Sequence, residues 1–233
     1  MRGGWQSLIA AADRRTRIPP GMIPPLSPMP KPFVSLLALA FSAGAAFSAS
    51  AATTTPAETV TSFHAVLIDN MKAGATLKCS GRAEKVGAAV DVDFDLPFLA
   101  QRVLRRQWKD LSEEQRAQFI ATFRELVLAT YASQFAKFGG EKFETRETKD
   151  LADGTRLVNA KLTPGSGAPV NFDYVLREVP ESGKGWRIIN VVADGVSDLA
   201  IRASQYDKIY KASGFDGLIK QIKQQTEANK AGC

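Results

Sequence analysis

The sequence has few of the residues from which catalytic and metal sites are usually built. Its 233 residues include one histidine, His64, and two cysteines, Cys79 and Cys233. Two cysteines exclude a disulfide-rich scaffold and a zinc ribbon, and one histidine excludes a site built on several imidazole ligands. A Ser–His–Asp triad would have to use His64, which we expect at the surface or boundary of a helix. No glycine-rich phosphate-binding loop is present, and we predict that the protein is not an enzyme.

Asp91, Asp93 and Asp95 alternate along the chain and resemble a run of calcium ligands. An EF-hand loop that began at Asp91 would need glycine at its sixth position and glutamate at its twelfth. The sequence has Leu96 and Arg102 there. We therefore interpret the aspartates as a polar connector in which Asp95 caps the next helix, and we predict no metal site.

The first 51 residues have the three parts of a secretory signal. Basic residues and prolines lie in 1–32, an uncharged apolar stretch follows over 33–47, and Ala49-Ser50-Ala51 forms a small-residue cleavage pattern. The apolar stretch is shorter than the roughly 20 residues of a membrane-spanning helix. Met22 and Met29 are alternative starts, and an uncleaved anchor is the alternative to a cleaved signal. We predict export to the periplasm.

The leader carries most of the net charge of the chain. The whole sequence has 30 basic and 24 acidic residues, but residues 1–51 hold five basic residues and one acidic residue, which leaves 25 and 23 in the mature chain. A near-neutral chain does not favour a nucleic-acid partner. We expect Cys79 to be a buried or inert thiol. Export allows oxidation, so a reactive thiol and a disulfide to Cys233 stay open as alternatives.

The spacing of apolar residues predicts helices, then strands, then helices. Helical periods precede Gly139-Gly140, and a period of two follows it. The expected helices are 54–71, 78–90, 95–108 and 112–138, with two more after Gly195 that divide near Gly214, and the expected strands are 142–149, 155–163, 168–179 and 186–193. This order predicts an α+β domain over residues 52–225, with helices packed over a curved four-stranded antiparallel sheet. We expect residues 226–233 to form a frayed polar tail.

The predicted elements carry much aromatic and aliphatic surface that must be covered. One stripe of the helix at 112–138 includes Phe119 and Phe123, and one face of the third strand includes Phe172 and Tyr174. A solid core would use these residues, and so would an apolar cavity for a ligand between the sheet and the helices. Composition does not separate the two interpretations.

Four segments, in order along the chain, resemble one family of proteins. They are 94–97 (FDLP), 111–126 with its LSEEQR and FREL motifs, 193–197 (ADGVS) and 214–219 (GFDGLI). Together they span most of residues 56–225 and resemble the MlaC, or toluene-tolerance, family of periplasmic phospholipid-binding proteins. Asp194 stands where that family more often has glutamate.

The resemblance implies a nuclear-transport-factor-two-like or cystatin-like fold with an apolar cavity that encloses acyl chains. It implies a soluble carrier that moves phospholipid between an outer-membrane lipoprotein complex and an inner-membrane ABC transporter with an MCE-domain partner. We expect a monomer that binds lipid and holds no cofactor. A hopanoid-associated (HpnM-like) branch of the family leaves a hopanoid as an alternative ligand. The rival hypotheses are an exported enzyme on the same frame and a non-catalytic interaction protein with a solid core.

We expect a set of inward-facing apolar side chains to line the cavity and contact lipid. They are Phe98, Val103, Phe119, Phe123, Val127, Tyr131, Phe172, Tyr174, Ile188, Val192, Val196 and Leu199. Arg106 and Arg124 are candidates for contacting the lipid headgroup or a partner, and solvated surface charges are the alternative.

Overall fold

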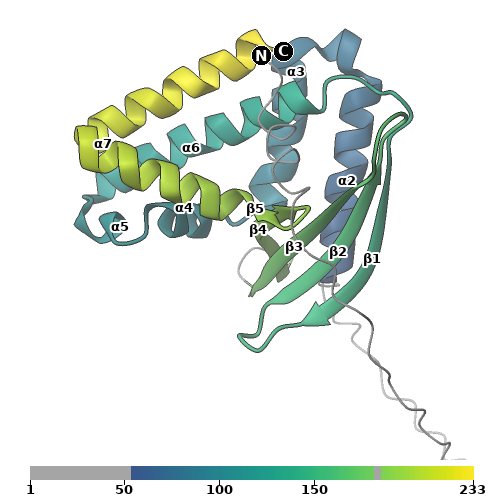
Figure 1. Cartoon of the computed structure of the whole chain (residues 1–233), viewed down its shortest axis with the longest axis horizontal. Helices are drawn as coiled ribbons and strands as arrows, with labels where there is room; N and C mark the ends of the chain where they lie inside the picture. Colours follow the sequence, from purple (N-terminus) through teal and green to yellow (C-terminus); the bar gives the residue numbers. More distant parts are fainter. Residues whose placement is uncertain (1–53, 181–184) are drawn as a thin grey trace, which may run out of the picture.

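The computed structural model describes residues 54–180 and 185–233, so the predicted export signal lies outside the described residues. The chain forms helices, then strands, then a long broken helix, which confirms the predicted α+β class (Figure 1). The helices are α2 (Pro56–Lys72), α3 (Gly74–Asp93), α4 (Leu96–Leu104), α5 (Gln107–Asp110), α6 (Glu113–Gln134) and α7 (Asp198–Ala231). The strands are β1 (Lys142–Asp150), β2 (Arg156–Thr163), β3 (Val170–Val179), β4 (Gly185–Ala193) and β5 (Val196–Ser197). None of the described helices is long and apolar enough to span a bilayer.

The strands form one open antiparallel sheet in the order β1-β2-β3-β4-β5. All four predicted strands are present, and β5 is a fifth that the prediction lacked. Asp194 and Gly195 have φ angles of 47° and 82°. This left-handed pair, which glycine adopts readily, reverses the chain so that Val196 pairs with Ala193. A strand of two residues shows no periodicity, and the sequence pattern therefore missed it.

Side-chain caps set where the two main helices of the N-terminal half begin. Thr55 and Glu58 form a capping box at the start of α2, and Ser112 and Gln115 form the predicted one at the start of α6. In each box the cap side chain accepts a hydrogen bond from the third helical amide, and the third side chain accepts one from the cap amide. At the N-terminus of each of these helices, two backbone N–H groups that have no partner within the helix thus gain a hydrogen bond.

Helix α6 is shorter than predicted and α3 is longer. The stripe of apolar residues predicted a helix as far as residue 138, but α6 ends at Gln134 and Phe135 leaves the helical conformation. The Phe135 ring then lies 6.2 Å from the ring of Phe143 on β1. Packing against the sheet thus overrides the helical period. The weak pattern at 78–90 belongs to α3, which has non-helical dihedral angles at Lys78.

The last third of the helical structure is α7, which reverses direction at a glycine. Gly214 has a φ of 65°, and the two halves of α7 meet there, close to the predicted division. Figure 1 shows the second half returning past the first toward the C-terminus. The predicted frayed tail is wrong, because α7 continues to Ala231. Thr226 is buried there, and the Asn229 amide donates to the hydroxyl of Thr130 on α6 at 2.9 Å.

A disulfide between Cys79 and Cys233 fastens the end of α7 to α3. The expectation that Cys79 is an inert thiol is therefore wrong, and the disulfide alternative is what the structure contains. The buried Arg82 lies beside it and donates to the carbonyl oxygens of Gly74, Ala132 and Cys233 at 2.7, 2.9 and 3.2 Å. Spacing alone did not predict the bond, because 154 residues separate the two cysteines.

Helix α2 covers the sheet, whereas the long helix α6 packs against α3 and α7. Figure 1 shows α2 lying along the bent strands, with α6 and α7 extending away from the sheet. Phe63 of α2 is fully buried, and its ring makes edge contacts with Phe94 at 5.0 Å and Tyr131 at 5.2 Å. This cluster joins the sheet layer to the helical layer.

His64 lies in the core and is not at the surface or boundary that the sequence suggested. Its side chain is 3% exposed, its Nε2 lies 2.9 Å from the Tyr174 hydroxyl, and its ring stacks on Phe143 at 4.0 Å. The bent sheet covers two successive positions of α2, so Phe63 and His64 are both buried. Burial lowers the pKa of His64 to about 3, and the imidazole is neutral at physiological pH.

The neutral His64 should make the folded state less stable as the pH falls through 6.5. The unfolded state binds a proton there, while the folded state with a pKa near 3 does not. Between pH 6.5 and pH 5 the free energy of unfolding should fall by up to about 2 kcal/mol from this group. Urea unfolding of the wild type and of His64→Gln at both pH values measures the difference. Equal pH slopes in the two proteins would contradict a buried neutral histidine.

Loss of the disulfide should lower the free energy of unfolding by about 2–5 kcal/mol, because the bond closes a long loop in the unfolded chain. We expect this loss in the double variant Cys79→Ser/Cys233→Ser, measured by urea unfolding at pH 7. A reductant should lower the stability of the wild type by a similar amount and leave the double variant unchanged. A wild type insensitive to reductant would show that the bond does not contribute.

Candidate functional site

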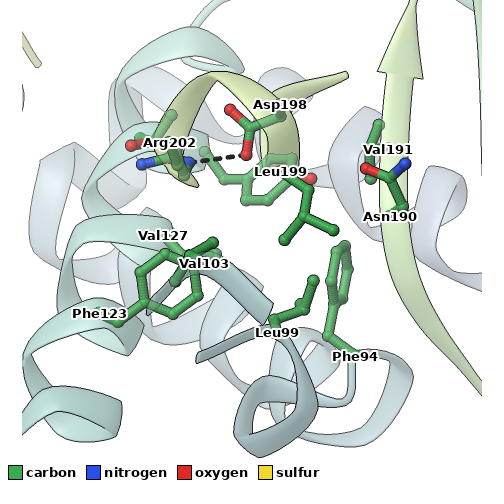
Figure 2. Close-up of a pocket in the computed structure, with 12 residues that line it drawn as sticks. Phe94, Leu99, Val103, Phe123, Val127, Asn190, Val191, Asp198, Leu199 and Arg202 are labelled. Carbon is green, nitrogen blue, oxygen red and sulfur yellow. Dashed lines mark hydrogen bonds and ion pairs between the residues drawn. The ribbon is translucent and has the colours of Figure 1, made fainter. Parts of the chain in front are cut away.

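Four elements enclose an apolar cavity at the place where the helical layer meets the end of the sheet. We call it the junction cavity, and its lining residues are Phe94, Leu99, Val103, Phe123, Val127, Thr130, Tyr131, Asn190, Val191, Asp198, Leu199 and Arg202. Figure 2 shows these side chains converging from α4, α6, β4 and α7, with Phe94 reaching in from the end of α3. The cavity encloses about 40 Å³. Ligand pockets are usually about 300–1,000 Å³, so its walls must separate before it can hold a large ligand.

The apolar walls follow from helical spacing. Leu99 and Val103 lie four residues apart on α4, and Phe123 and Val127 lie four apart on α6. Residues at this spacing occupy the same face of a helix, so each helix presents a pair of side chains to the cavity. Leu199, in the first turn of α7, closes the cavity from a third direction (Figure 2).

One side of the junction cavity is polar. Asp198 and Arg202, four residues apart on α7, form an ion pair in which Nε donates to Oδ2 at 2.7 Å. Their side chains are only 28% and 14% exposed. The guanidinium also lies 5.9 Å from the centroid of the Phe123 ring. In Figure 2 this pair lies across the cavity from Phe94.

The ion pair between Asp198 and Arg202 shifts the pKa values of the ionisable groups on the polar side of the cavity. Burial on its own lowers the pKa of Arg202, but the neighbouring Asp198 carboxylate raises it, and the net shift is upward. Burial raises the pKa of Tyr131, and the negative charge of Asp198 adds to that shift. Arg202 is therefore charged, Tyr131 is protonated, and the cavity has a fixed dipole at one side and apolar walls elsewhere.

A family model described as MlaC protein matches residues 62–224, well over half of the chain. The chain belongs to the MlaC family. The resemblance seen in its motifs is thereby confirmed.

The relatives of this MlaC-family chain include one curated protein and one solved structure. A Haemophilus influenzae protein named intermembrane phospholipid transport system binding protein MlaC is 28% identical over 132 residues, which cover 56% of this chain and 61% of that protein. The match thus spans about three fifths of that relative's length. A phospholipid-binding protein from Ralstonia solanacearum, solved in complex with a phospholipid, has a TM-score of 0.62 at 22% identity, covering 73% of this chain and 96% of that one. At this identity the likeness shows a common fold.

Five of the predicted lining residues of this MlaC-family protein are at the junction cavity. They are Val103, Phe123, Val127, Tyr131 and Leu199. The others lie elsewhere in the fold. Phe119 is buried behind Phe123, with the two rings 5.9 Å apart, and Phe172, Tyr174 and Ile188 belong to the buried core of the sheet. Phe98 is half-buried, and its ring lies 4.8 Å from the guanidinium of Arg177. Val196 is in β5.

Val192 was assigned to the wrong face of its strand. The register of β3 and β4 shifts between Val175 and Leu176, which leaves one extra residue, Ile189, in β4. After such a bulge the alternation of faces reverses. Val192 therefore pairs with Asp173, and Val191 lines the cavity in its place.

Several lining residues were not predicted. Leu99 shares the face of Val103, and Asp198 and Arg202 are opposite charges four residues apart, so helical spacing could have found them. Asn190 and Val191 follow the bulge, and Phe94 reaches the cavity from the end of α3 through a bridge to Ile188. Neither the bulge nor the bridge has a signal in the sequence.

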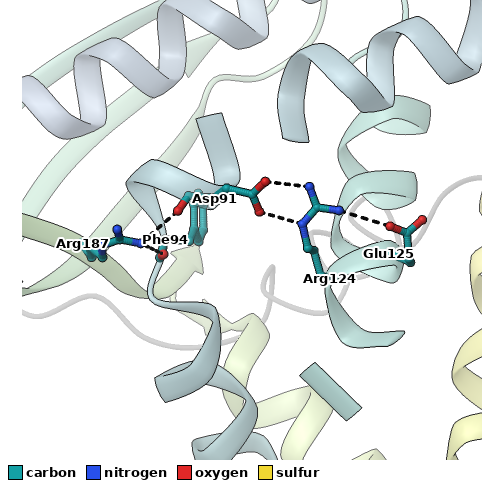
Figure 3. Close-up of polar contacts among 5 residues, drawn as sticks. All are labelled: Asp91, Phe94, Arg124, Glu125 and Arg187. Atoms are coloured by element: carbon teal, nitrogen blue, oxygen red, sulfur yellow. Dashed lines mark hydrogen bonds and ion pairs between the residues drawn. The ribbon is translucent and has the colours of Figure 1, made fainter. Parts of the chain in front are cut away.

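Arg124 points away from the junction cavity and forms a bidentate ion pair. Its Nε and Nη2 donate to the two carboxylate oxygens of Asp91 on α3 at 2.6 and 2.7 Å, and its Nη1 donates to Glu125 at 3.2 Å (Figure 3). These hydrogen bonds raise the pKa of Arg124, and the one to Asp91 has the largest effect. The pair ties α6 to α3. Arg106, the other predicted candidate, is exposed and does not line the cavity.

The predicted polar connector holds for only one of the three aspartates, because Asp91 and Asp93 lie in the last turn of α3 and Asp95 alone lies between α3 and α4. Asp91 pairs with Arg124, and Asp95 caps α4 by accepting from the Phe98 amide at 3.0 Å and pairs with Arg177. Over residues 54–180 and 185–233 no group of three or more histidine, cysteine, aspartate or glutamate side chains is arranged to hold a metal ion.

The Arg124–Asp91 pair should contribute to stability. Their side chains are 33% and 44% exposed, and solvent screens such a pair, so we expect a coupling energy of about 0.5–1 kcal/mol. A double-mutant cycle with Arg124→Ala and Asp91→Ala, followed by urea unfolding, measures it. The more exposed pair Arg146–Glu144 serves as a control with coupling near zero. No coupling between Arg124 and Asp91 would leave Arg124 free for a docking role.

Proposed function

We propose that this protein is a periplasmic lipid carrier that encloses the acyl chains of a phospholipid in the junction cavity. The observation that carries the proposal is the cavity itself, an apolar space lined from α4, α6, β4 and α7 with one polar side. The names of the two relatives, a phospholipid transport binding protein and a phospholipid-bound structure, support the same ligand.

The physical chemistry of acyl chains explains why a carrier is needed. Each methylene transferred from water to an apolar environment gains about 0.8 kcal/mol, so an unprotected chain leaves a membrane slowly. A protein that covers the chain removes that cost, while a charged headgroup can remain at the polar side of the cavity. The enclosed volume is about 40 Å³, so the walls of the cavity must move apart when acyl chains enter it.

The proposed compartment and partners rest on other features. The apolar stretch at 33–47 and the small residues before 52 suggest export, and the Cys79–Cys233 disulfide is typical of an oxidising compartment. We propose that the carrier works as a monomer between an outer-membrane lipoprotein complex and an inner-membrane ABC transporter with an MCE-domain partner. Nucleic acid is not a proposed partner, and no cofactor is proposed beyond the bound lipid. A hopanoid as ligand stays a prediction.

The arrangement of the polar groups favours a carrier over an enzyme. The buried His64 contacts Tyr174 and Phe143 in the sheet core and does not line the junction cavity. The two charged residues that do line it neutralise each other as an ion pair. Neither arrangement provides a general base beside a nucleophile, so we propose that the protein is not a catalyst.

A bulky residue in the cavity should prevent lipid uptake. Native mass spectrometry of protein purified from the periplasm, or incubated with phospholipid vesicles, should show the mass of one bound lipid. In Val127→Trp the larger ring fills the cavity, and we expect at least tenfold less bound lipid by this measurement.

The matched control is Ala121→Trp, which places the same side chain on the exposed side of α6. It should load lipid like the wild type, and thermal unfolding should show that both variants are folded. A wild type that neither contains lipid nor takes it up from vesicles would overturn the carrier proposal.

A further inference from the structure

The Asp198–Arg202 pair forms a wall between two spaces. On one side it lines the junction cavity, and on the other it lines an outer groove of about 570 Å³ between α6 and the two halves of α7. Thr130 of α6 is the third residue that lines both spaces. A molecule with apolar chains in the cavity and a polar headgroup in the groove would therefore contact Asp198 and Arg202 where the two parts join.

The geometry of Arg202 leaves it suited to a second anion. Its Nε–H donates to Asp198, and the Tyr206 hydroxyl also interacts with the guanidinium. The two terminal nitrogens carry four N–H donors, more than this one hydroxyl can use. Among the described residues Asp198 is the one carboxylate with which it forms an ion pair. On the cavity side the ring of Phe123 lies 5.9 Å from the guanidinium, within the range of a cation–π contact. Terminal guanidinium nitrogens bind phosphate oxygens in a bidentate manner.

The Asp198 carboxylate restricts the charge that a headgroup bound to Arg202 can have. A purely anionic headgroup on Arg202 would also approach the Asp198 carboxylate, and like charges at this range repel. An ammonium group on the same headgroup would instead interact favourably with Asp198. A zwitterion thus satisfies both members of the pair, which are mostly buried and would pay for losing a partner.

The rest of the outer groove does not impose a strong charge. Its lining includes the amide side chains of Gln205, Gln221 and Gln225, which hydrogen-bond to polar groups of either sign. Lys208 is the other cationic residue that lines it, and this side chain is exposed to solvent and lies outside the junction cavity. Solvent screens its charge, so the buried pair has the larger influence on a bound headgroup.

We propose that Asp198 and Arg202 form a headgroup site that selects zwitterionic phosphoethanolamine lipids over anionic phosphoglycerol lipids. Arg202 binds the phosphate and Asp198 binds the ammonium group, while the acyl chains occupy the junction cavity. The proposal rests on the carrier function proposed above and adds a preference that the apolar walls cannot provide.

The test offers the protein vesicles that contain phosphatidylethanolamine, phosphatidylglycerol and diacylglycerol in equal parts, with native mass spectrometry as the readout. The wild type should take up the ethanolamine lipid in excess over the glycerol lipid by about fivefold, the size expected for one partly buried charge contact. Asp198→Asn should remove or reverse the excess. Arg202→Gln should lower uptake of both phospholipids and leave diacylglycerol, which has no phosphate, unchanged.

Glu227→Gln is the matched control, because it makes the same kind of charge change on the same helix at a residue that lines neither space. It should keep the wild-type ratio. Soluble phosphoethanolamine at equal concentration should not displace the lipid, since it lacks the chains; displacement would overturn the assignment to a lipid headgroup.

Two other results would overturn the proposal and point to different causes. Equal uptake of the two phospholipids by the wild type and both variants, or an excess of the glycerol lipid in the wild type, refutes the headgroup site and leaves the carrier function standing. No uptake of any of the three lipids refutes the carrier function and the headgroup site together.

Discussion

The connector between α3 and α4 holds the helical layer to the sheet, and the rest of the structure depends on it. Arg187 of β4 donates to the carbonyl of Phe94 at 3.0 Å, and the Asp95 amide donates to the carbonyl of Ile188 at 3.0 Å. These backbone groups lie in the interior and need partners there. Because the join is fixed, the Phe94 ring packs on Phe63 and at the same time forms part of the cavity wall.

The small volume of the junction cavity is a consequence of how much an empty apolar space costs. A cavity of 300 Å³ without a ligand would destabilise the protein by about 7 kcal/mol at 24 cal/mol per Å³. That is comparable with the whole free energy of unfolding of a typical domain, about 5–15 kcal/mol. A carrier that spends part of its time unloaded must therefore bring its walls together. The walls that would have to move lie on four separate elements, α4, α6, β4 and α7.

Local patterns predicted the elements well, and contacts distant in the sequence limited the rest. The capping box at Ser112 and the pair Phe123 and Val127 depend on neighbours three or four residues away, so the sequence shows them directly. The face of Val192 depends on a bulge, and the burial of His64 depends on how the sheet bends over α2. No periodicity encodes either. The family resemblance came from short motifs at turns and helix starts, where backbone geometry restricts the choice of residue.

The Cys79–Cys233 bond has a consequence for the integrity of the chain. Every residue that lines the junction cavity, from Phe94 to Arg202, lies between the two cysteines and thus inside one covalent ring. A protease that cuts the exposed turn at 151–154 opens this ring but releases no fragment, because the disulfide still joins the two pieces. A nicked molecule therefore keeps all four walls of the cavity together for as long as its surroundings stay oxidising.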